Sequence, residues 1–413
     1  MTSPTRYAGG PFARYLLLFS TLALVLLGLV MVYSASSVAD YVNLDDSAYH
    51  FKRQLGWMVL GLVGMAIAMK VDYRSIRRLT WPFFGICLTG LVLVPIVGMG
   101  KWGAQRWISI GGVSIQPSEY AKLACLLVAA HLIVQLHSRV ISQKDFWGRL
   151  AITCGACTAL IMKQPDMGTT ISLLAAVFVV LILGNIRTTW LLGISLSGIA
   201  LGLIGIFSAG YRAQRFMAFL DPWADPQKGG YQTIQAMLAF GSGGLDGVGL
   251  GLSRQKFFYL PAAHTDFIFA IIGEELGLIG TLSVVLAFLL FAYAGTKIAL
   301  GARDEFGKLL AGGLAGMIAT QAIMNMMAVT GLMPVTGIPL PFVSSGGSSL
   351  TFTLVCVGLV LSVSSHGTRG VRPVRATGAG KENARARDDE RGRNRWPHLS
   401  GIDGGRGTTR RRA

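Results

Sequence analysis

The sequence predicts an all-α polytopic membrane protein, and three observations lead to that prediction. The chain of 413 residues is 52% hydrophobic but only 14% charged, and its mean hydropathy is +0.54. Soluble domains carry about a quarter charged residues. Apolar runs long enough to cross a hydrocarbon core of about 30 Å recur along the chain. Because backbone polar groups in lipid must be satisfied internally, these runs are predicted to be helices.

About ten transmembrane helices are predicted from these runs. The first run is long and many further runs follow it, so we interpret it as a retained helix and not as a cleaved signal peptide. A long extracytoplasmic loop, residues 209–266, separates the seventh and eighth spans. The predicted spans are 14–33, 54–71, 80–98, 119–137, 147–162, 169–186, 189–208, 267–296, 308–330 and 348–365.

This assignment divides the chain into an N-terminal segment (1–13), a transmembrane domain (14–365) and a tail (366–413). Lys and Arg are more frequent in the short segments on the side of the termini. The positive-inside rule therefore predicts both termini in the cytoplasm, with the 209–266 loop facing the periplasm. The tail is rich in Gly and Arg, so we expect it to be disordered and to contact anionic membrane lipid. Its arginines lack interleaved aromatic residues, and nucleic-acid binding is not predicted.

Four polar segments meet the outer boundary of the bilayer in this topology. Irregular backbone at membrane depth is tolerated only where it is buried in protein or lines a water-filled cavity. The sequence therefore predicts a polar cavity that opens outward. The segments are QPSEYAK (116–122), KQPDMGTT (163–170), HTDF (264–267) and PVTGIPLPFVSSGGSSL (334–350).

Two charged residues of the first polar segment, Glu119 and Lys122, are spaced i, i+3 and share one helix face. Charges embedded in a membrane usually pair or mark a functional path. An internal ion pair is one interpretation, with Asp166 as a competing partner for Lys122. The same network would also shape a polar pocket in which Lys122 meets an anionic ligand, and both interpretations stay open.

Asp266 stands where an aqueous loop meets the apolar start of the eighth span. Partial desolvation there would raise the pKa of the carboxyl group and make it a better general base. The alternative is a helix cap made by Thr265 or Asp266. Deeper in the span, at least one of Glu274 and Glu275 is predicted to pair with another polar group inside the bundle.

Basic residues lie on both sides of Asp266 in the long loop. Cations beside a carboxylate at a membrane face suit a phosphorylated lipid head group, although a solvated loop surface is the simpler interpretation. The glycines of GSGGLDGVGLG (241–251) are predicted to form tight turns and not a phosphate loop. The basic candidates are Arg212, Arg215, Arg254 and Lys256.

Five stretches of the chain resemble the SEDS proteins, a family named for shape, elongation, division and sporulation. The resemblance covers residues 12–365 in the family's order, and FLDPWADPQ and TGIPLPF resemble its FtsW division branch more than its RodA elongation branch. The stretches are GAQRWISIGGVSIQPSEYAKLA, KQPDMGTT, FLDPWADPQKGGYQTIQAMLAFGSGG, SRQKFFYLPAAHTDFIFAIIGEELGLIG and MPVTGIPLPFVSSGGSSL.

The resemblance implies a peptidoglycan glycosyltransferase that polymerises lipid II into β-1,4 glycan strands for septal synthesis. It implies a class B penicillin-binding protein and other cell-division proteins as partners. It also implies a contribution from a divalent cation, Mg or Mn, for which the sequence shows no dedicated ligands. The family's essential aspartate falls on Asp266. The other implied site residues are Glu119, Lys122, Asp166, His264, Ser344, Ser348 and Ser349.

A transporter that flips lipid II across the cytoplasmic membrane is the alternative function. An outward cavity with buried charge is also typical of transporters. A transporter, however, needs polar sites that can be reached from both faces. Because the polar segments gather at the outer face only, the sequence favours the enzyme.

Overall fold

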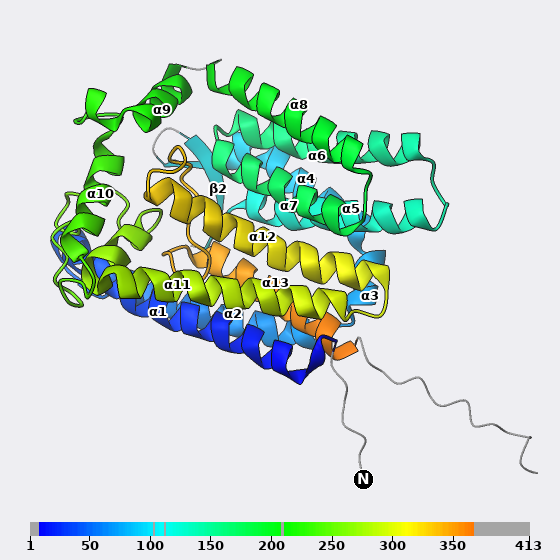
Figure 1. The fold of residues 1–413 in the computed structure, drawn as a ribbon, viewed down its shortest axis with the longest axis horizontal. Helices are drawn as coiled ribbons and strands as arrows, with labels where there is room; N and C mark the ends of the chain where they lie inside the picture. Colours follow the sequence, from blue (N-terminus) through cyan, green and yellow to red (C-terminus); the bar gives the residue numbers. More distant parts are fainter. Residues whose placement is uncertain (1–7, 102–103, 111–112, 208–209, 367–413) are drawn as a thin grey trace, which may run out of the picture. The chain divides into compact units, whose positions relative to one another are not determined.

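The computed structural model describes residues 8–101, 104–110, 113–207 and 210–366, which belong to one compact unit. The tail from residue 367 onwards and the first seven residues lie outside the described residues. Within these ranges, each predicted span coincides with one long helix (Figure 1). The helices are α1 (Gly10–Leu44), α2 (Tyr49–Lys70), α4 (Thr80–Val97), α5 (Pro117–His137), α6 (Gln143–Lys163), α7 (Met167–Leu183), α8 (Thr188–Phe207), α11 (Ile268–Leu300), α12 (Glu305–Val329) and α13 (Gly347–His366).

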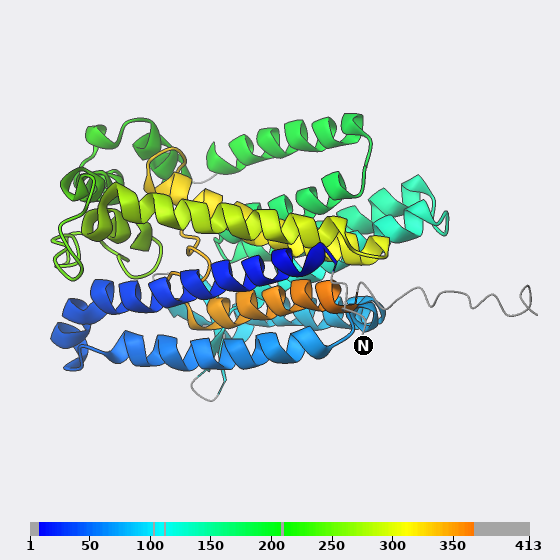
Figure 2. The same ribbon diagram turned by 60° about the horizontal axis from the view of Figure 1, so that its bottom comes forward.

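Six of the described helices are long and apolar enough to cross a membrane: α1, α4, α5, α11, α12 and α13. Three of them form the core, because 72% of α5, 67% of α12 and 78% of α13 are buried over their most apolar windows. The pair α2 and α13 packs most extensively, and α1 lies beside both α2 and α11 (Figure 2). The prediction of a helical membrane protein is thus confirmed, with its polar segments at the helix ends.

Three short strands precede α5 and add a small sheet to the predicted helical fold. They are β1 (Met99–Lys101), β2 (Ala104–Ile110) and β3 (Val113–Ile115), and they form one antiparallel sheet in the order β1-β2-β3. Ile108 pairs with Ile115 across the second ladder. The pattern of ISI and VSI on either side of Gly-Gly is typical of a hairpin, since apolar and polar residues alternate in both. This sheet matters for the site because β2 carries Arg106.

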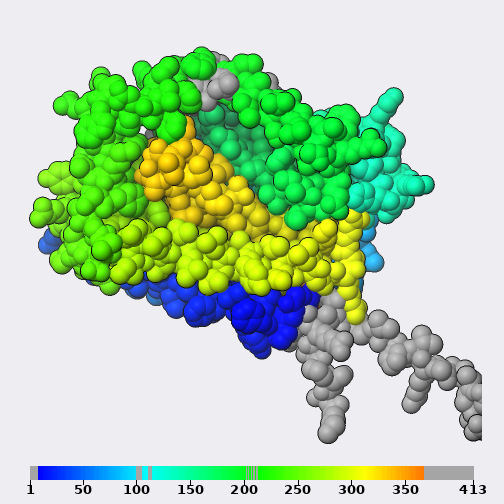
Figure 3. Space-filling model, viewed as in Figure 1, coloured from blue at the N-terminus to red at the C-terminus, as the bar shows by residue number. Residues whose placement is uncertain are grey.

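The long loop between α8 and α11 contains helical structure of its own. It forms α9 (Gly210–Leu220), a 3-10 turn η1 (Pro222–Ala224) and α10 (Tyr231–Gly243). A short helix α3 (Tyr73–Arg78) lies at the opposite end of the bundle from α10 (Figure 1). Figure 3 shows the surface hollowed between α8–α9 and the end of α12 with the loop that follows it.

Helix α11 is interrupted at Gly277, whose backbone has φ 64° and ψ −160°. The glycine-rich segment 244–249 fills the interruption, and a Cβ atom at Gly277 would lie 2.3 Å from the carbonyl oxygen of Leu245. The predicted tight turns are confirmed, because Gly244, Gly247 and Gly249 all have positive φ. Four backbone bonds join the two segments: Val248 N to Glu274 O (2.9 Å), Gly249 N to Glu275 O (3.0 Å), Leu278 N to Gly244 O (3.0 Å) and Ile279 N to Leu245 O (3.2 Å).

The two glutamates just above this interruption are both paired inside the bundle, as the sequence predicted. The Glu274 carboxylate accepts from the backbone N–H of Arg254 (2.9 Å) and from the Ser253 hydroxyl. The Glu275 carboxylate accepts from Ser34 (2.7 Å) and lies 3.6 Å from Lys256 Nζ. Lys256 is therefore an internal counter-ion and not the free cation that the sequence suggested.

Candidate functional site

The Asp266 carboxylate lies immediately before α11 and does not cap that helix. The N-cap residue is Phe267, with no capping side chain, and the Thr265 hydroxyl donates to Ala262 O (3.1 Å). The alternative of a helix cap is therefore wrong. Among the described residues, no hydrogen-bond donor or ion-pair partner reaches the carboxylate oxygens of Asp266. A partly buried carboxylate with free oxygens can accept a proton or a ligand contact.

The backbone around Asp266 is held by α12 and by the loop before α13. Asn325 Nδ2 donates to Asp266 O and to Ile338 O, both at 2.8 Å. Ser344 Oγ donates to Thr265 O (2.6 Å). A Cβ atom on Gly337 would lie 3.6 Å from Asp266 Oδ2, so the loop backbone passes close to the carboxylate. These contacts fix the position of the carboxylate without occupying its oxygens.

Burial, two arginines and one carboxylate set the pKa of Asp266. Burial raises the pKa of Asp266 to about 6, and the nearby Asp166 carboxylate also raises it. The guanidinium groups of Arg106 and Arg215 lower the pKa of Asp266, because positive charge favours the ionised carboxylate. Asp266 is therefore mostly ionised at neutral pH but retains appreciable proton affinity, which is the property a general base needs.

Asp166 is the N-cap of α7 and not a partner of Lys122. Its carboxylate accepts from the backbone N–H of Thr169 (3.1 Å), from the Thr169 hydroxyl (2.8 Å) and from Gln116 Nε2 (3.2 Å). Arg106 lies 3.9 Å from the same carboxylate and donates to Gln164 O (3.2 Å). The structure thus brings Asp166 close to Asp266 through a shared arginine.

Glu119 and Lys122 form the internal ion pair that one interpretation of the sequence favoured. The two charges are 2.9 Å apart, and Lys122 is only 1% exposed. Lys122 Nζ also donates to Gln321 Oε1 (2.7 Å), and Gln321 Nε2 donates to Pro339 O (3.1 Å). The pair therefore supports the 334–343 loop from inside, and no surface presents Lys122 to a ligand.

The three predicted serines are also buried. Ser344 holds the Asp266 segment and accepts from Leu340 N (2.8 Å), while Ser349 donates to Glu119 at 3.4 Å. The Ser348 hydroxyl is buried, and no described group is its hydrogen-bond partner. Their contacts place Ser344 and Ser349 in the support of the site.

The remaining predicted residues are dispersed around the same end of the bundle. Arg215 on α9 and Arg254 are exposed, and the side chain of Arg212 lies outside the described residues. The ring of His264 lies 4.7 Å from the ring of His50, and burial beside that second histidine lowers the pKa of His264 to about 4. His264 is therefore neutral at physiological pH.

Sequence reasoning missed three residues that the structure places at the site: Arg106, Gln321 and Asn325. Arg106 lies in a predicted loop, and nothing in the local sequence indicates its contact with Gln164, 58 residues further along the chain. Gln321 and Asn325 did leave a signal. Two amide side chains four residues apart on an apolar helix share one face and need internal partners.

The residues of the site do not by themselves fit a resident divalent cation. Among the described residues, no three His, Cys, Asp or Glu side chains are placed to hold a metal ion. Asp166 is committed to Thr169, Gln116 and Arg106, which leaves Asp266 as the carboxylate with free oxygens. Mg²⁺ is often held by one or two carboxylates together with substrate phosphates. The cation therefore stays a prediction that depends on the substrate.

The fold and the site define a polytopic integral membrane protein. At one end of its helix bundle, a carboxylate without a hydrogen-bond partner among the described residues lies near two arginines. The sequence model of one family, described as cell cycle protein and named for FtsW, RodA and SpoVE, matches residues 14–369. The chain belongs to this family, and the resemblance to the SEDS proteins is confirmed.

Curated relatives match nearly the whole transmembrane domain. Stage V sporulation protein E of Bacillus subtilis is 45% identical over 356 residues, which are 85% of this chain and 96% of that protein. A protein of Trichlorobacter lovleyi named "Probable peptidoglycan glycosyltransferase FtsW" is 41% identical over 351 residues, which are 84% of this chain and 92% of that protein.

Solved structures share the fold. A chain of the structure described as "Structural coordination of polymerization and crosslinking by a peptidoglycan synthase complex" is 31% identical, with a TM-score of 0.71 over 86% of this chain and 98% of that chain. The rod shape determining protein RodA of Thermus thermophilus is 29% identical, with a TM-score of 0.63 over 86% of this chain and 97% of that chain.

Proposed function

We propose that this chain is a peptidoglycan glycosyltransferase that polymerises lipid II into β-1,4 glycan strands. The carboxylate of Asp266 carries the proposal, because it has free oxygens, a raised pKa and arginines beside it at the polar end of the bundle. Family membership supports the reaction class, since relatives about 40% identical bear the name of peptidoglycan glycosyltransferase.

The stereochemistry of the product requires one inversion. An α-linked pyrophosphate donor gives a β-1,4 bond when the acceptor oxygen attacks the anomeric carbon in line with the leaving group. Asp266 takes the proton of the acceptor GlcNAc 4-hydroxyl as the O4–C1 bond forms. The C1–oxygen bond to the pyrophosphate breaks in the same step, and its electron pair leaves with undecaprenyl pyrophosphate.

The leaving group departs as an anion and needs cations at its position. Arg215 is exposed and close enough to lower the pKa of Asp266, and Arg254 is exposed on the same long loop, whereas Lys256 is held by Glu275. Arginine suits this role because its guanidinium group forms bidentate hydrogen bonds with phosphate oxygens. A divalent cation, where bound, would supply further neutralisation of the pyrophosphate.

The proposed location is the outer face of the cytoplasmic membrane, with both termini in the cytoplasm. The excess of Lys and Arg in short segments on the terminal side supports this orientation. A class B penicillin-binding protein is the proposed partner, because a structural relative belongs to a synthase complex that both polymerises and crosslinks. The FtsW-named relatives support a role in septal synthesis with other cell-division proteins.

The experiment that tests the function is polymerisation in detergent. Purified chain, with a class B penicillin-binding protein and lipid II, is expected to give glycan strands that a denaturing gel resolves. A micelle has no second leaflet, so a protein that only flips lipid II would leave the substrate unpolymerised. Absence of polymer with folded chain and active partner would contradict the proposal.

The pH dependence of polymerisation follows from the raised pKa of Asp266. The base must be ionised, so the rate is expected to rise with pH along a limb whose midpoint lies near 6. Arg215→Gln removes a cation that lowers this pKa, and the limb is expected to move to higher pH. Initial rates measured across the acidic range check both expectations. The exposed Arg303→Gln serves as a control, and an identical shift in that variant would rule out a local effect of Arg215.

A further inference from the structure

A second polar pocket lies at the end of the bundle opposite Asp266. It is a cavity of about 430 Å³ between the end of α5, the start of α6 and the α7–α8 connection. Helix α5 has 21 residues and separates the pocket from the Glu119 end by about 30 Å, the thickness of a hydrocarbon core. In the proposed orientation the pocket therefore opens at the inner leaflet, and the reaction proposed above makes no use of it.

The pocket presents two arginines that no carboxylate of the described chain neutralises. Arg139 and Arg187 are exposed, and no acidic side chain of the described residues forms an ion pair with either. The acidic groups nearby are occupied elsewhere: Glu305 pairs with His137, and Asp145 accepts from Ser142 at the start of α6. The pocket therefore has a positive charge that an anion would complement.

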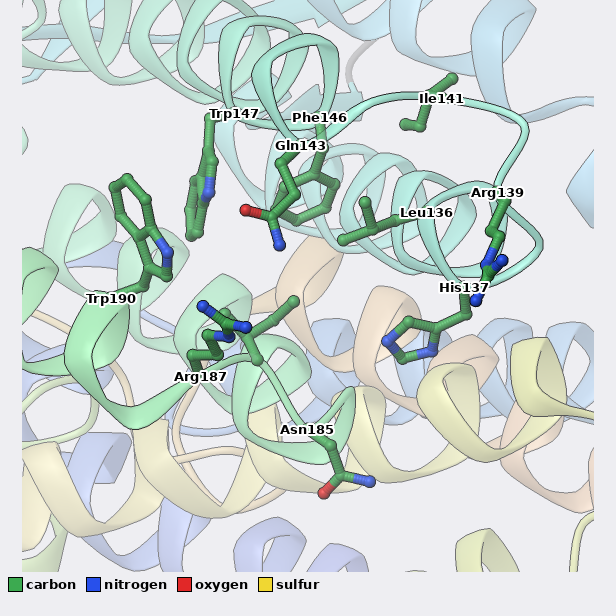
Figure 4. A pocket seen from close by; sticks show the side chains of 11 residues that line it. Leu136, His137, Arg139, Ile141, Gln143, Phe146, Trp147, Asn185, Arg187 and Trp190 are labelled. Carbon is green, nitrogen blue, oxygen red and sulfur yellow. The ribbon is translucent and has the colours of Figure 1, made fainter.

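The remaining lining combines amide donors with indole rings. Gln143 and Asn185 supply the amides, and the rings of Trp147 and Trp190 lie 5.1 Å apart. Figure 4 shows the two indoles on one side of the pocket and His137 with Arg139 on the other. Tryptophan at the level of lipid head groups is typical of membrane interfaces.

Helices α5 and α7 each end beside the pocket, and both end in a turn of the same type. Arg139 (φ 56°) and Asn185 (φ 50°) adopt left-handed backbone, and the next residue of each donates to a carbonyl five residues back. Glycine adopts this conformation at least cost, so an arginine there is retained at an energetic cost of about 1 kcal/mol. The Arg139 side chain lines the pocket beside His137 (Figure 4).

We propose that this pocket binds the phosphodiester head group of an anionic phospholipid at the inner leaflet. Arginines suit phosphate oxygens through paired, charge-assisted hydrogen bonds, and basic pockets between membrane helices are a known arrangement for anionic lipid. The cavity volume admits a head group. The indole rings of Trp147 and Trp190 would pack against the glycerol of the bound lipid, because an amphipathic ring is favoured at the boundary between lipid and water.

The test measures lipid binding to the full chain by native mass spectrometry from detergent. Phosphatidylglycerol is expected to bind more tightly than phosphatidylcholine. The double variant Arg139→Gln/Arg187→Gln is expected to weaken phosphatidylglycerol binding about tenfold or more, since each arginine–phosphate contact contributes on that scale. Arg303→Gln removes an exposed arginine at the same end of the bundle and is expected to leave binding unchanged.

Three outcomes would overturn the proposal. The first is equal binding of the two lipids, and the second is unchanged phosphatidylglycerol binding in the double variant. The third is displacement of the lipid by an equal concentration of inorganic phosphate, which would identify a free-anion site. Because both arginines are exposed, the double variant is expected to unfold at the wild-type temperature, and that measurement confirms its fold.

Discussion

Asp266→Asn is expected to reduce the rate of glycan polymerisation by about a hundredfold or more, with little change in fold. The amide has nearly the same shape as the carboxylate but cannot take the proton of the acceptor hydroxyl, and general base catalysis contributes about 10²–10⁴ in rate. Since no described donor is bonded to the Asp266 carboxylate, the substitution leaves no internal partner unsatisfied. The measurement is the initial rate on lipid II with the partner present.

Asp246→Asn is the matched control for this variant. Asp246 belongs to the same long loop and is exposed, so its substitution is expected to keep near-normal activity. Unfolding temperatures of both variants establish that each is folded. Glycan strands made at the wild-type rate by folded Asp266→Asn would remove the carboxylate from the mechanism, whereas equal losses in both variants would indicate a general effect of the loop.

Lys122→Met is expected to lower the free energy of unfolding by about 3–5 kcal/mol. The substitution removes the partner of Glu119 and leaves an uncompensated charge in the interior, which costs that much in typical buried pairs. It also removes the hydrogen bond that Lys122 donates to Gln321, the residue that holds the 334–343 loop through Pro339. A denaturant titration of the protein in detergent micelles measures the change in the free energy of unfolding.

The double variant Glu119→Gln/Lys122→Met separates the two causes. Removing both charges is expected to recover part of the lost stability, because the buried carboxylate is gone. Lys163→Met provides the control, since Lys163 is an exposed lysine in the last turn of α6. If Lys122→Met proved as stable as Lys163→Met, the buried pair would not support the loop.

The helical frame was predictable because lipid imposes a simple rule on sequence. An apolar run long enough to cross the bilayer has to be helical, and each predicted span coincides with one helix of the described chain. The β1–β3 sheet was missed because hydropathy carries no information about short strands at the bilayer surface. The sheet does leave a signal of another kind, the alternating residues around Gly-Gly.

The site was predictable only in part, because its support comes from residues distant in sequence. The position of Asp266 at the boundary of loop and span left a general base and a helix cap open, and the resemblance to the SEDS proteins assigned it the family's essential aspartate. The partner of Lys122 was open until the structure showed Glu119 and Gln321 within hydrogen-bond distance. The position of Arg106 depends on how a sheet packs against the α6–α7 turn, and spacing along one chain does not reveal such a contact.

The break in α11 gives the molecule a joint about three turns below the proposed catalytic carboxylate. Backbone from 244–249 bonds to Glu274 and Glu275 above this joint and to Leu278 and Ile279 below it, so the segment splints the two parts of α11. A force that a partner applied to the outer loop would therefore be transmitted to Ile268–Leu276 and to Leu278–Leu300 together.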